Sequence, residues 1–474
     1  MKQHTKFYAN GQWLPSTGKD HIDVTNPYTE EAIASVQSSS PKDITTAVHA
    51  AHVAFKSWSQ SSVHTRIDLL KKIALVLKDQ QEELGQTILS ELGMPLKMTL
   101  RVQVAAPIAT FELTAKELEN FIWEEQVGNS KVVREPSGVV AAITPWNYPL
   151  HQIAAKVAPA IASGCTVILK PSEVTPLNAI LLAKAFELAG APAGIFNVVF
   201  GDGASVADTL LTAPEVDLIS FTGSTRAGKS IMAVAAQQIK RVRLELGGKS
   251  AAIILPGADL QKATKATVNS CFMNSGQTCS ALTRLLVHEK DYEAVAEMAV
   301  THAKSFTLGD PMNETTRLGP LVSKVQQERV KGFIGQGIAE GAKLLLGGQT
   351  MPEGLTKGFF VSPTILGDVL PRNTIAKEEV FGPVLSLIKY SDVNHAIEIA
   401  NDTNYGLAGA VWGASSDDAF LVAQKIRTGQ VDINGANFNM LAPFGGFKQS
   451  GFGRELGKFG IEEFLELKSY QMPA

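Results

Sequence analysis

From about residue 139 onward, short apolar runs alternate with helical stretches, and this alternation limits the fold more than any other feature. Five of the runs have the length of strands; they cover residues 138–144, 166–170, 196–200, 217–223 and 241–247. Strands that alternate with helices at this spacing build parallel sheets covered by helices. A second alternating region extends from 251 to about 450. The sequence therefore predicts an α/β protein built from two such regions.

Length and charge narrow the class of protein. With 474 residues, the chain is long enough for two or three domains with buried cores. Hydrophobic residues make up 45% of the chain and the formal net charge is −3, so neither nucleic acid nor an anionic membrane is an expected partner. The most apolar region, 139–169, is interrupted by prolines and a lysine, which indicates buried strands and a helix rather than a membrane span.

The cysteines are few and scattered. Cys165, Cys271 and Cys279 predict neither a disulfide framework nor a metal site. Reduced thiols are typical of the cytosol, and the N-terminal residues lack the apolar segment of a signal peptide. We therefore expect a cytoplasmic protein that holds no metal ion.

Both ends of the chain depart from the alternating pattern. Residues 6–36 read as short strands and turns, and a helix cap at Ser40 and Pro41 then opens long helical patterns that continue to about residue 120. The tail after Phe459 alternates enough to form a last strand. Such an exposed strand is either covered by a partner subunit or packed as an ordinary edge.

One glycine motif supports two different nucleotide sites. Residues 223–230, GSTRAGKS, match the P-loop pattern and lie between a strand and a helix. A triphosphatase would also need an Mg²⁺-linked aspartate at the end of a later strand, and Asp259 does not close one. Alternatively, Gly223 and Ser224 at a helix N-terminus offer free N–H groups to the pyrophosphate of a dinucleotide. We favour the dinucleotide.

The end of the strand at 166–170 is consistent with that preference. Lys170 is followed by a turn and then by Glu173. A carboxylate at this place can accept both hydroxyls of a ribose and would repel a 2′-phosphate, which favours NAD over NADP. Lys170 can donate to the same ribose. The alternative is a surface pair of lysine and glutamate.

Three residues are candidates for the chemistry. Cys279 lies in a polar, glycine-containing turn between two apolar segments, and Glu245 ends a strand just before a glycine pair. A thiol and a carboxylate are the groups needed to form and then hydrolyse a thioester. Asn147 follows a strand between two prolines, where its amide can stabilise an oxyanion, although loop asparagines more often cap turns. For the cysteine, the alternative is an inert buried thiol, which suits Cys165 and Cys271.

Seven motifs together resemble the NAD(P)-dependent aldehyde dehydrogenase superfamily in their order and spacing. They lie between about 139 and 454 and read PWNYP, KPSE, FTGST, LELGGK, GQTC, EEVFGP and PFGGFKQSG. The resemblance implies a Rossmann-like cofactor domain, an α/β catalytic domain and a small β arm for oligomerisation. The expected ranges are 1–117 and 137–248 for NAD binding, 249–448 for catalysis, and 118–136 and 449–474 for the arm and tail. Homodimers or homotetramers are expected.

The resemblance also implies a reaction, the NAD-dependent oxidation of an aldehyde to a carboxylic acid. Cys279 would attack the aldehyde, Asn147 would hold the oxyanion, and Glu245 would activate the water that hydrolyses the thioester. Lys156 would belong to a proton path. Cofactor contacts would come from Trp146, Lys170, Glu173, Gly223, Ser224, Glu379 and Phe381. Members that transfer the acyl group to coenzyme A generally lack the base, so Glu245 favours a free acid.

The positions that resemble the family's aldehyde channel carry no arginine or lysine. They are Tyr148, Ala155, Thr278, Ser280, Phe438 and Phe444. A large aromatic side chain often fills the place of Ala155 in related enzymes, so the pocket gains room here. We expect a neutral aliphatic or aryl aldehyde rather than a dicarboxylic semialdehyde. The alternatives to this enzyme are the triphosphatase and a catalytically silent family member.

Overall fold

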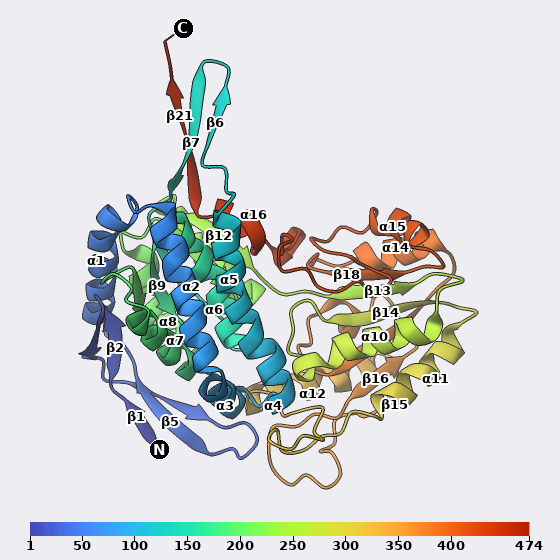
Figure 1. Ribbon diagram of the computed structural model, residues 1–474. Helices are drawn as coiled ribbons and strands as arrows, with labels where there is room; N and C mark the ends of the chain where they lie inside the picture. Colours follow the sequence, from blue (N-terminus) through green and yellow to red (C-terminus); the bar gives the residue numbers. More distant parts are fainter. Residues whose placement is uncertain (474) are drawn as a thin grey trace.

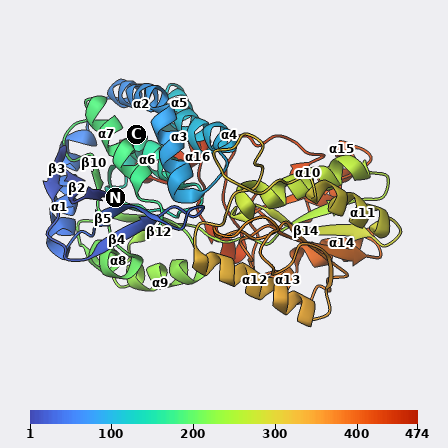
Figure 2. The same ribbon diagram turned by 90° about the horizontal axis from the view of Figure 1, so that it is seen from below.

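The computed structural model of the chain describes residues 1–473, apart from the side chains of residues 204, 205 and 207, and it consists of two lobes and a projecting arm (Figure 1). Each lobe is built on a mostly parallel sheet, as the alternation of apolar runs predicted. Figure 2 shows the two lobes side by side from a second direction. The α/β fold expected from the sequence is therefore confirmed.

The sheet of the first lobe has eight strands in the order β20-β12-β11-β8-β9-β10-β2-β3. The five central strands are parallel, and the outer ones join them in antiparallel pairs. The central strands β8, β9 and β11 are buried along their whole length, which is why they read as continuous apolar runs. The bounds are β20 (Gly451–Phe452), β12 (Arg241–Glu245), β11 (Leu218–Thr222), β8 (Val139–Ile143), β9 (Thr166–Lys170), β10 (Phe196–Val198), β2 (Lys6–Ala9) and β3 (Gln12–Pro15).

Helices precede and connect these strands. The first helix begins at the predicted cap, where Ser40 and Asp43 form a reciprocal capping box ahead of Pro41. The connecting helices α6, α7 and α9 pack directly on the sheet. The bounds are α1 (Pro41–Trp58), α2 (Val63–Asp79), α3 (Gln81–Leu92), α4 (Leu96–Met98), the π-helix η1 (Thr99–Val104), α5 (Ala105–Leu118), α6 (Pro149–Ser163), α7 (Leu177–Leu188), α8 (Gly203–Thr212) and α9 (Thr225–Ala236).

The sheet of the second lobe has seven strands in the order β15-β16-β17-β14-β13-β18-β19, and only β15 is antiparallel to its neighbour. Its strands are β15 (Lys343–Leu346), β16 (Thr364–Gly367), β17 (Val384–Tyr390), β14 (Leu282–His288), β13 (Ser250–Ile254), β18 (Gly409–Trp412) and β19 (Asp432–Ile433). The helical segments of this lobe are α10 (Leu260–Phe272), the 3₁₀ turn η2 (Met273–Gly276), α11 (Tyr292–Ala303), α12 (Lys324–Ala339), α13 (Thr374–Lys377), α14 (Val393–Asn401) and α15 (Ser416–Ala423).

The arm is an antiparallel sheet that joins distant parts of the sequence. Strands β6 (Glu124–Val127) and β7 (Ser130–Pro136) form a hairpin, and β21 (Leu465–Gln471) pairs with β7 along its whole length. The arm extends away from the first lobe, with the C-terminus near its tip (Figure 1). The predicted last strand after Phe459 is thus present. Strand β20, although it lies within 449–474, belongs to the sheet of the first lobe instead.

Three smaller elements complete the fold. A second small sheet is made of β1 (Lys2–His4), β5 (Ala32–Gln37) and β4 (His21–Thr25), so the N-terminal region does contain the short strands that were predicted. The turn η3 (Lys448–Ser450) precedes β20, and α16 (Gly457–Glu462) leads to β21 and packs on α5 and α6. No helix within residues 1–473 is both long enough and apolar enough to cross a bilayer.

Candidate active site

A cavity between the two lobes gathers most of the residues singled out in the sequence. Its walls come from the segments that follow β8, β11 and β12 in the first lobe and from those that precede β14 and β17 in the second. The carboxyl ends of the first sheet's strands therefore face the amino ends of the second sheet's strands. In α/β proteins, ligands bind at the carboxyl ends of the strands. Eight predicted residues line the cavity: Trp146, Asn147, Gly223, Ser224, Glu245, Cys279, Glu379 and Phe381.

Cys279 and Glu245 face each other in this cavity. Burial and the carboxylates of Glu245 and Glu379 raise the pKa of the Cys279 thiol well above its usual value, while the N–H of Ser280 lowers it. Burial and the carboxylate of Glu455 raise the pKa of Glu245 as well. Both carboxylate oxygens of Glu245 are buried without a standard hydrogen bond, and the thiol makes only a weak contact with them. The carboxylate is therefore free to bind a water molecule.

The turn before Cys279 has an uncommon backbone. Asn274, Ser275 and Gly276 all have positive φ angles, of 50°, 57° and 74°. Two consecutive non-glycine residues in the left-handed region are held only where surrounding contacts fix them. Here the side chain of Ser275 donates to the oxygen of Gly319 over 2.8 Å. The turn thus places the thiol through a strained conformation.

Asn147 is fixed from three sides. Its side-chain amide donates to the main-chain oxygen of Gln277 over 3.0 Å. Its own main-chain oxygen accepts from the side chains of Gln103, at 3.0 Å, and Asn274, at 2.8 Å. The amide has two N–H groups and uses one of them on Gln277, so the second can point to a substrate oxygen. The alternative of a simple turn cap does not describe these contacts.

Lys156 has a partner that the sequence did not indicate. Its ammonium group is 1% exposed and forms an ion pair with Glu455, whose side chain is 15% exposed. Both charges act on Glu245, since Glu455 raises its pKa and Lys156 lowers it. Glu455 lies in a glycine-rich stretch 299 residues away from Lys156, and only the fold brings the two together. The pair connects the buried carboxylate with a partly exposed one.

Of the residues predicted to contact the cofactor, Lys170 and Glu173 do not line this cavity but lie at the end of β9, the strand next to β8. Lys170 ends β9, and its ammonium group donates to Glu173 over 2.9 Å, with the glutamate side chain 41% exposed. Ser224 caps α9 by accepting from the N–H of Ala227 at 3.2 Å. The N–H of Gly223 donates to the main-chain oxygen of Glu245 at 3.0 Å. Together these contacts place a helix N-terminus beside the reacting groups.

The P-loop interpretation is not compatible with this geometry. Helix α9 already begins at Thr225, so Gly228, Lys229 and Ser230 lie inside the helix and form no loop around a phosphate. The side chain of Lys229 donates to Gln449 over 3.0 Å instead. A phosphate-cradling loop needs its backbone N–H groups free, and here they belong to a helix.

Glu379 and Phe381 close the cavity from the second lobe. A carboxylate oxygen of Glu379 accepts from the N–H of Gly248 at 2.9 Å, and burial raises the pKa of this carboxyl group. The ring of Phe381 meets that of Trp146 edge to face, with centroids 5.3 Å apart. Six further residues line the same cavity and were not predicted as site residues: Pro145, Thr222, Leu246, Gly247, Gln326 and Arg329.

A separate apolar cluster lies behind the thiol. Ala155, Leu407, Phe444 and Leu456 form it, and Cys279 packs against it. Of these, the sequence had indicated Ala155 and Phe444 but not the two leucines.

The remaining pocket residues lie close to this cluster. The hydroxyls of Tyr148 and Thr278 are 2.7 Å apart, and Thr278 and Ser280 flank the thiol in sequence. Phe438, which is 52% exposed, meets Phe444 edge to face at 6.1 Å.

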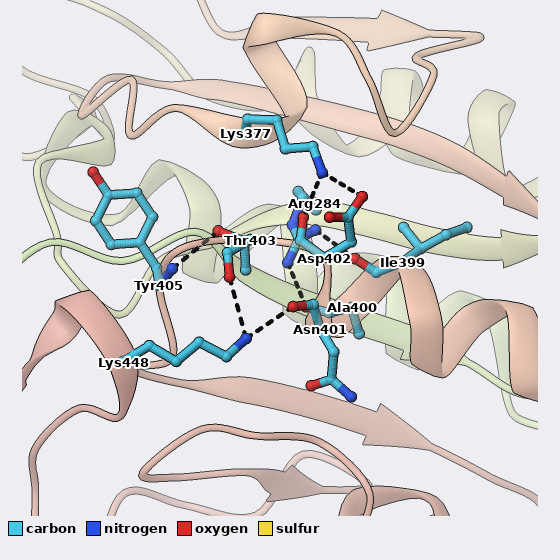
Figure 3. A network of polar contacts seen from close by, with 9 residues as sticks. All are labelled: Arg284, Lys377, Ile399, Ala400, Asn401, Asp402, Thr403, Tyr405 and Lys448. Atoms are coloured by element: carbon cyan, nitrogen blue, oxygen red, sulfur yellow. Dashed lines mark hydrogen bonds and ion pairs between the residues drawn. The ribbon is translucent and has the colours of Figure 1, made fainter.

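A polar network fixes the second lobe beneath the site (Figure 3). The guanidinium group of Arg284 donates to the main-chain oxygens of Lys249, Ile399 and Ala400 at 2.8–3.0 Å. Lys448 donates to the oxygens of Asn401 and Thr403 in the following turn. Arg284, in the strand after Cys279, is thus joined to the end of α14 (Figure 3). Through Lys249 it is also joined to the segment after Glu245. Cations at a helix C-terminus are also favoured by its dipole.

The other titratable groups add no second centre of this kind. Cys165 and Cys271 are free and fully buried, and burial raises the pKa of Cys271 to about 12. Among the described residues, no group of three or more histidine, cysteine, aspartate or glutamate side chains could hold a metal ion.

Comparison with known proteins identifies the family. The aldehyde dehydrogenase family matches residues 13–470. A 3-succinoylsemialdehyde-pyridine dehydrogenase of a Pseudomonas species is 47% identical over 470 residues, which cover 99% of this chain and 98% of that protein. The chain belongs to the aldehyde dehydrogenase family.

Solved structures agree with this assignment. A mutant of aldehyde dehydrogenase C from Pseudomonas syringae, in complex with NAD+ and octanal, has a TM-score of 0.98 and 44% identity, and the match covers 99% of this chain and 97% of that one. An aldehyde dehydrogenase of Mycobacterium tuberculosis in complex with NAD+ has a TM-score of 0.97 and 38% identity, over 100% of this chain and 99% of that one.

Proposed function

We propose that this protein oxidises a neutral aliphatic or aryl aldehyde to a carboxylic acid with NAD as the oxidant. The observation that carries the proposal is the single cavity that is lined by Asn147, Glu245 and the N-terminus of α9 from the first lobe and by Cys279 from the second. One nucleophile, one oxyanion donor and one base are the groups that the two half-reactions require.

NAD fits the residues of the cavity. Lys170 and Glu173 at the end of β9 would hold the adenosine ribose, Ser224 the pyrophosphate, and Glu379 the nicotinamide ribose, with Trp146 and Phe381 beside the ring. The partly exposed Glu173 carboxylate disfavours a 2′-phosphate, and hence NADP. Gly247 leaves room for this arrangement, since a Cβ built on it would lie 2.5 Å from a carboxylate oxygen of Glu379. When bound, NAD supplies the acceptor for the hydride that leaves the substrate carbon.

The first half-reaction uses the thiol. The Cys279 sulfur attacks the aldehyde carbon, and the new oxyanion accepts from the free N–H of the Asn147 amide and from the N–H of Cys279. Because the thiol pKa is raised, the Cys279 thiol must first lose its proton to solvent water, and the thiolate then attacks. Loss of hydride from this thiohemiacetal leaves a thioester on Cys279.

The second half-reaction uses the carboxylate. Glu245 takes a proton from a water molecule, whose oxygen attacks the thioester carbon; the C–S bond then breaks and releases the carboxylic acid and the thiolate of Cys279. Burial raises the pKa of Glu245, so its carboxylate is a stronger base toward water than a solvated one. The ion pair of Lys156 and Glu455 would carry that proton onward, because both groups act directly on the charge of Glu245.

The substrate preference rests on the apolar cluster behind the thiol. Ala155, Leu407, Phe444 and Leu456 offer no charge to a second carboxylate. Tyr148, Thr278, Ser280 and Phe438 would complete the pocket. Two relatives support this choice, one by its complex with octanal and the other by a name that includes a pyridine-bearing aldehyde. We therefore favour neutral chains and rings over dicarboxylic semialdehydes.

The test is NADH formation with a panel of aldehydes, with Cys279→Ala as the matched variant. We expect NADH with hexanal or benzaldehyde and none from the variant. Higher kcat/KM with succinic semialdehyde would overturn the substrate preference. Absence of NADH from every aldehyde, in folded protein that binds NAD, would point to a silent homologue.

We also propose that the arm assembles a homodimer or homotetramer and that the protein is cytoplasmic. Apolar side chains on and beside the arm are well exposed in one chain, among them Ile122 at 65% and Leu467 at 68%. The cytoplasmic location is supported by the three cysteines, which are all free. The domain ranges given above are part of the same proposal. Sedimentation of the wild type and Leu467→Asp tests the assembly, since the new charge should shift the equilibrium to smaller species.

A further inference from the structure

A second, larger cavity lies between the lobes, and none of the predicted catalytic residues lines it. Its volume is about 640 Å³, within the range that binds small molecules. One wall is formed by α4 and the start of η1, and the opposite wall by the end of α10, η2 and residues 306–317. Figure 2 shows α4 and α10 approaching each other at the junction of the lobes.

The cavity has an apolar floor and a basic rim. Five side chains make most of the floor: Met94, Met98, Phe272, Met273 and Phe306. Three cations and one carboxylate stand around it: Lys97, Arg101, Arg317 and Glu314.

The cations differ in how they are engaged. Arg317 stacks on the ring of Phe306 at 4.2 Å and donates to Ser305, whereas Lys97 and Arg101 have no ionic partner among residues 1–473. Long apolar contact together with unpaired positive charge suits an amphipathic anion.

The two walls also hold the oxyanion residue. Gln103, in the π-helix η1, and Asn274, in the left-handed turn, both donate to the main-chain oxygen of Asn147. The side-chain oxygen of Gln103 is buried and has no hydrogen-bond partner. A π-helix in such a place is often functional, because its hydrogen bonds are easily rearranged. A molecule that pushes the walls apart would therefore move Asn147.

We propose that this cavity binds a straight-chain carboxylate and that its binding slows catalysis through Gln103 and Asn274. The chain of the ligand lies on the methionines and phenylalanines, and its carboxylate is held by Lys97 and Arg101. The ligand is either the product of the enzyme's own reaction or a free fatty acid, which share this chemistry. The binding of a carboxylate in this cavity does not depend on the proposed function. The expected effect on kcat does, because it assumes dehydrogenase activity.

Octanoate is the probe for binding, measured by calorimetry on the full chain with NAD present. We expect Arg101→Gln to weaken binding by about fivefold or more, as for the loss of one charged hydrogen bond. Lys72→Gln, which removes an exposed lysine of α2, should leave binding unchanged. The cavity-filling Met98→Trp should abolish binding in protein that still shows a cooperative thermal transition. Equal binding by all variants would overturn the site.

The kinetic test uses NADH formation at saturating NAD and varied aldehyde. Octanoate should lower kcat severalfold with little change in the KM of the aldehyde, while acetate and octanol should not. An increase in KM alone would show that octanoate occupies the aldehyde pocket and would overturn the proposal. Octanoate binding without any dehydrogenase activity would overturn the proposed function but not the site. Slowing that grows as octanoate accumulates during octanal turnover would identify the product as a ligand, whereas slowing by added octanoate only above the concentrations reached in turnover would point to a free fatty acid.

Discussion

Gly248 lies against the main-chain oxygen of Cys279, so closely that a Cβ built on the glycine would be 2.3 Å from that oxygen. The N–H of the same glycine donates to Glu379. Because Gly248 has no side chain, the segment after Glu245 can approach both Cys279 and Glu379. A larger residue must displace either its own segment or the main chain at Cys279.

Gly248→Ala should lower kcat by about 100-fold, because a displacement near 1 Å between reacting groups is enough for such a loss. Steady-state NADH formation measures it. Gly332→Ala is the matched control, since its Cβ would have no atom within 4 Å and it lies in helix α12. The control should keep full activity and equal or higher thermal stability. Normal kcat in Gly248→Ala would show that the close approach has no bearing on catalysis.

Glu245→Gln should separate the two half-reactions. The variant keeps the thiol and the oxyanion donors, so NADH should form once per active site in a rapid burst. Hydrolysis then lacks its base, and the steady-state rate should fall by about 100- to 1,000-fold. Stopped-flow absorbance detects the burst, and intact-protein mass spectrometry detects the acyl group on Cys279. A variant without a burst would place Glu245 before hydride transfer instead.

Much of the fold could be predicted because the central strands are buried on both faces. Residues 139–143, 166–170 and 218–222 read as unbroken apolar runs for that reason. The cap at Ser40 and the helix after Ser224 follow from local hydrogen bonds, which depend on neighbouring residues only. Strand β20 was not predicted, since two residues in a glycine-rich stretch carry no periodicity.

The same distinction applies to the site. Cys279, Glu245 and Asn147 stand in recognisable local patterns, and the structure brings them to one cavity. No local pattern marks the three residues that contact site residues far away in sequence. These are Glu455, which pairs with Lys156, and Gln103 and Asn274, which donate to Asn147. Long-range side-chain contacts are set by packing, which a single sequence does not display.

Ala155→Leu should narrow the substrate range. Ala155 is 3% exposed within the apolar cluster against which Cys279 packs, so extra methyl groups there take space from the aldehyde. We expect kcat/KM to fall about tenfold or more for octanal and benzaldehyde, with acetaldehyde much less affected. The ratio of octanal to acetaldehyde within each enzyme corrects for any loss of folded protein. An equal loss for all three aldehydes would place Ala155 outside the pocket.

The buried Lys249 lies beside Arg284, and its titration should make the stability of the protein depend on pH. It is 2% exposed, and burial, together with the charge of Arg284, lowers its pKa from 10.5 to about 7. The unfolded chain keeps the ordinary value, so between about pH 7 and 10.5 the unfolded state binds more protons than the folded state. The contribution of Lys249 to the free energy of unfolding therefore rises with pH in this range and is lowest below about pH 7.

Lys249→Met keeps the length of the side chain but removes this titration. Urea denaturation at pH 7, 8 and 9 should show the wild type gaining stability over the variant as pH rises, by at most about 1.4 kcal/mol per pH unit for one proton. Lys72→Met, which removes an exposed lysine of α2, is the control, and its difference from the wild type should not vary with pH. If the difference for Lys249→Met were also constant with pH, the ammonium group of Lys249 would be solvated in the folded protein. The positive charge of Lys249 beside Arg284 would then not destabilise the fold.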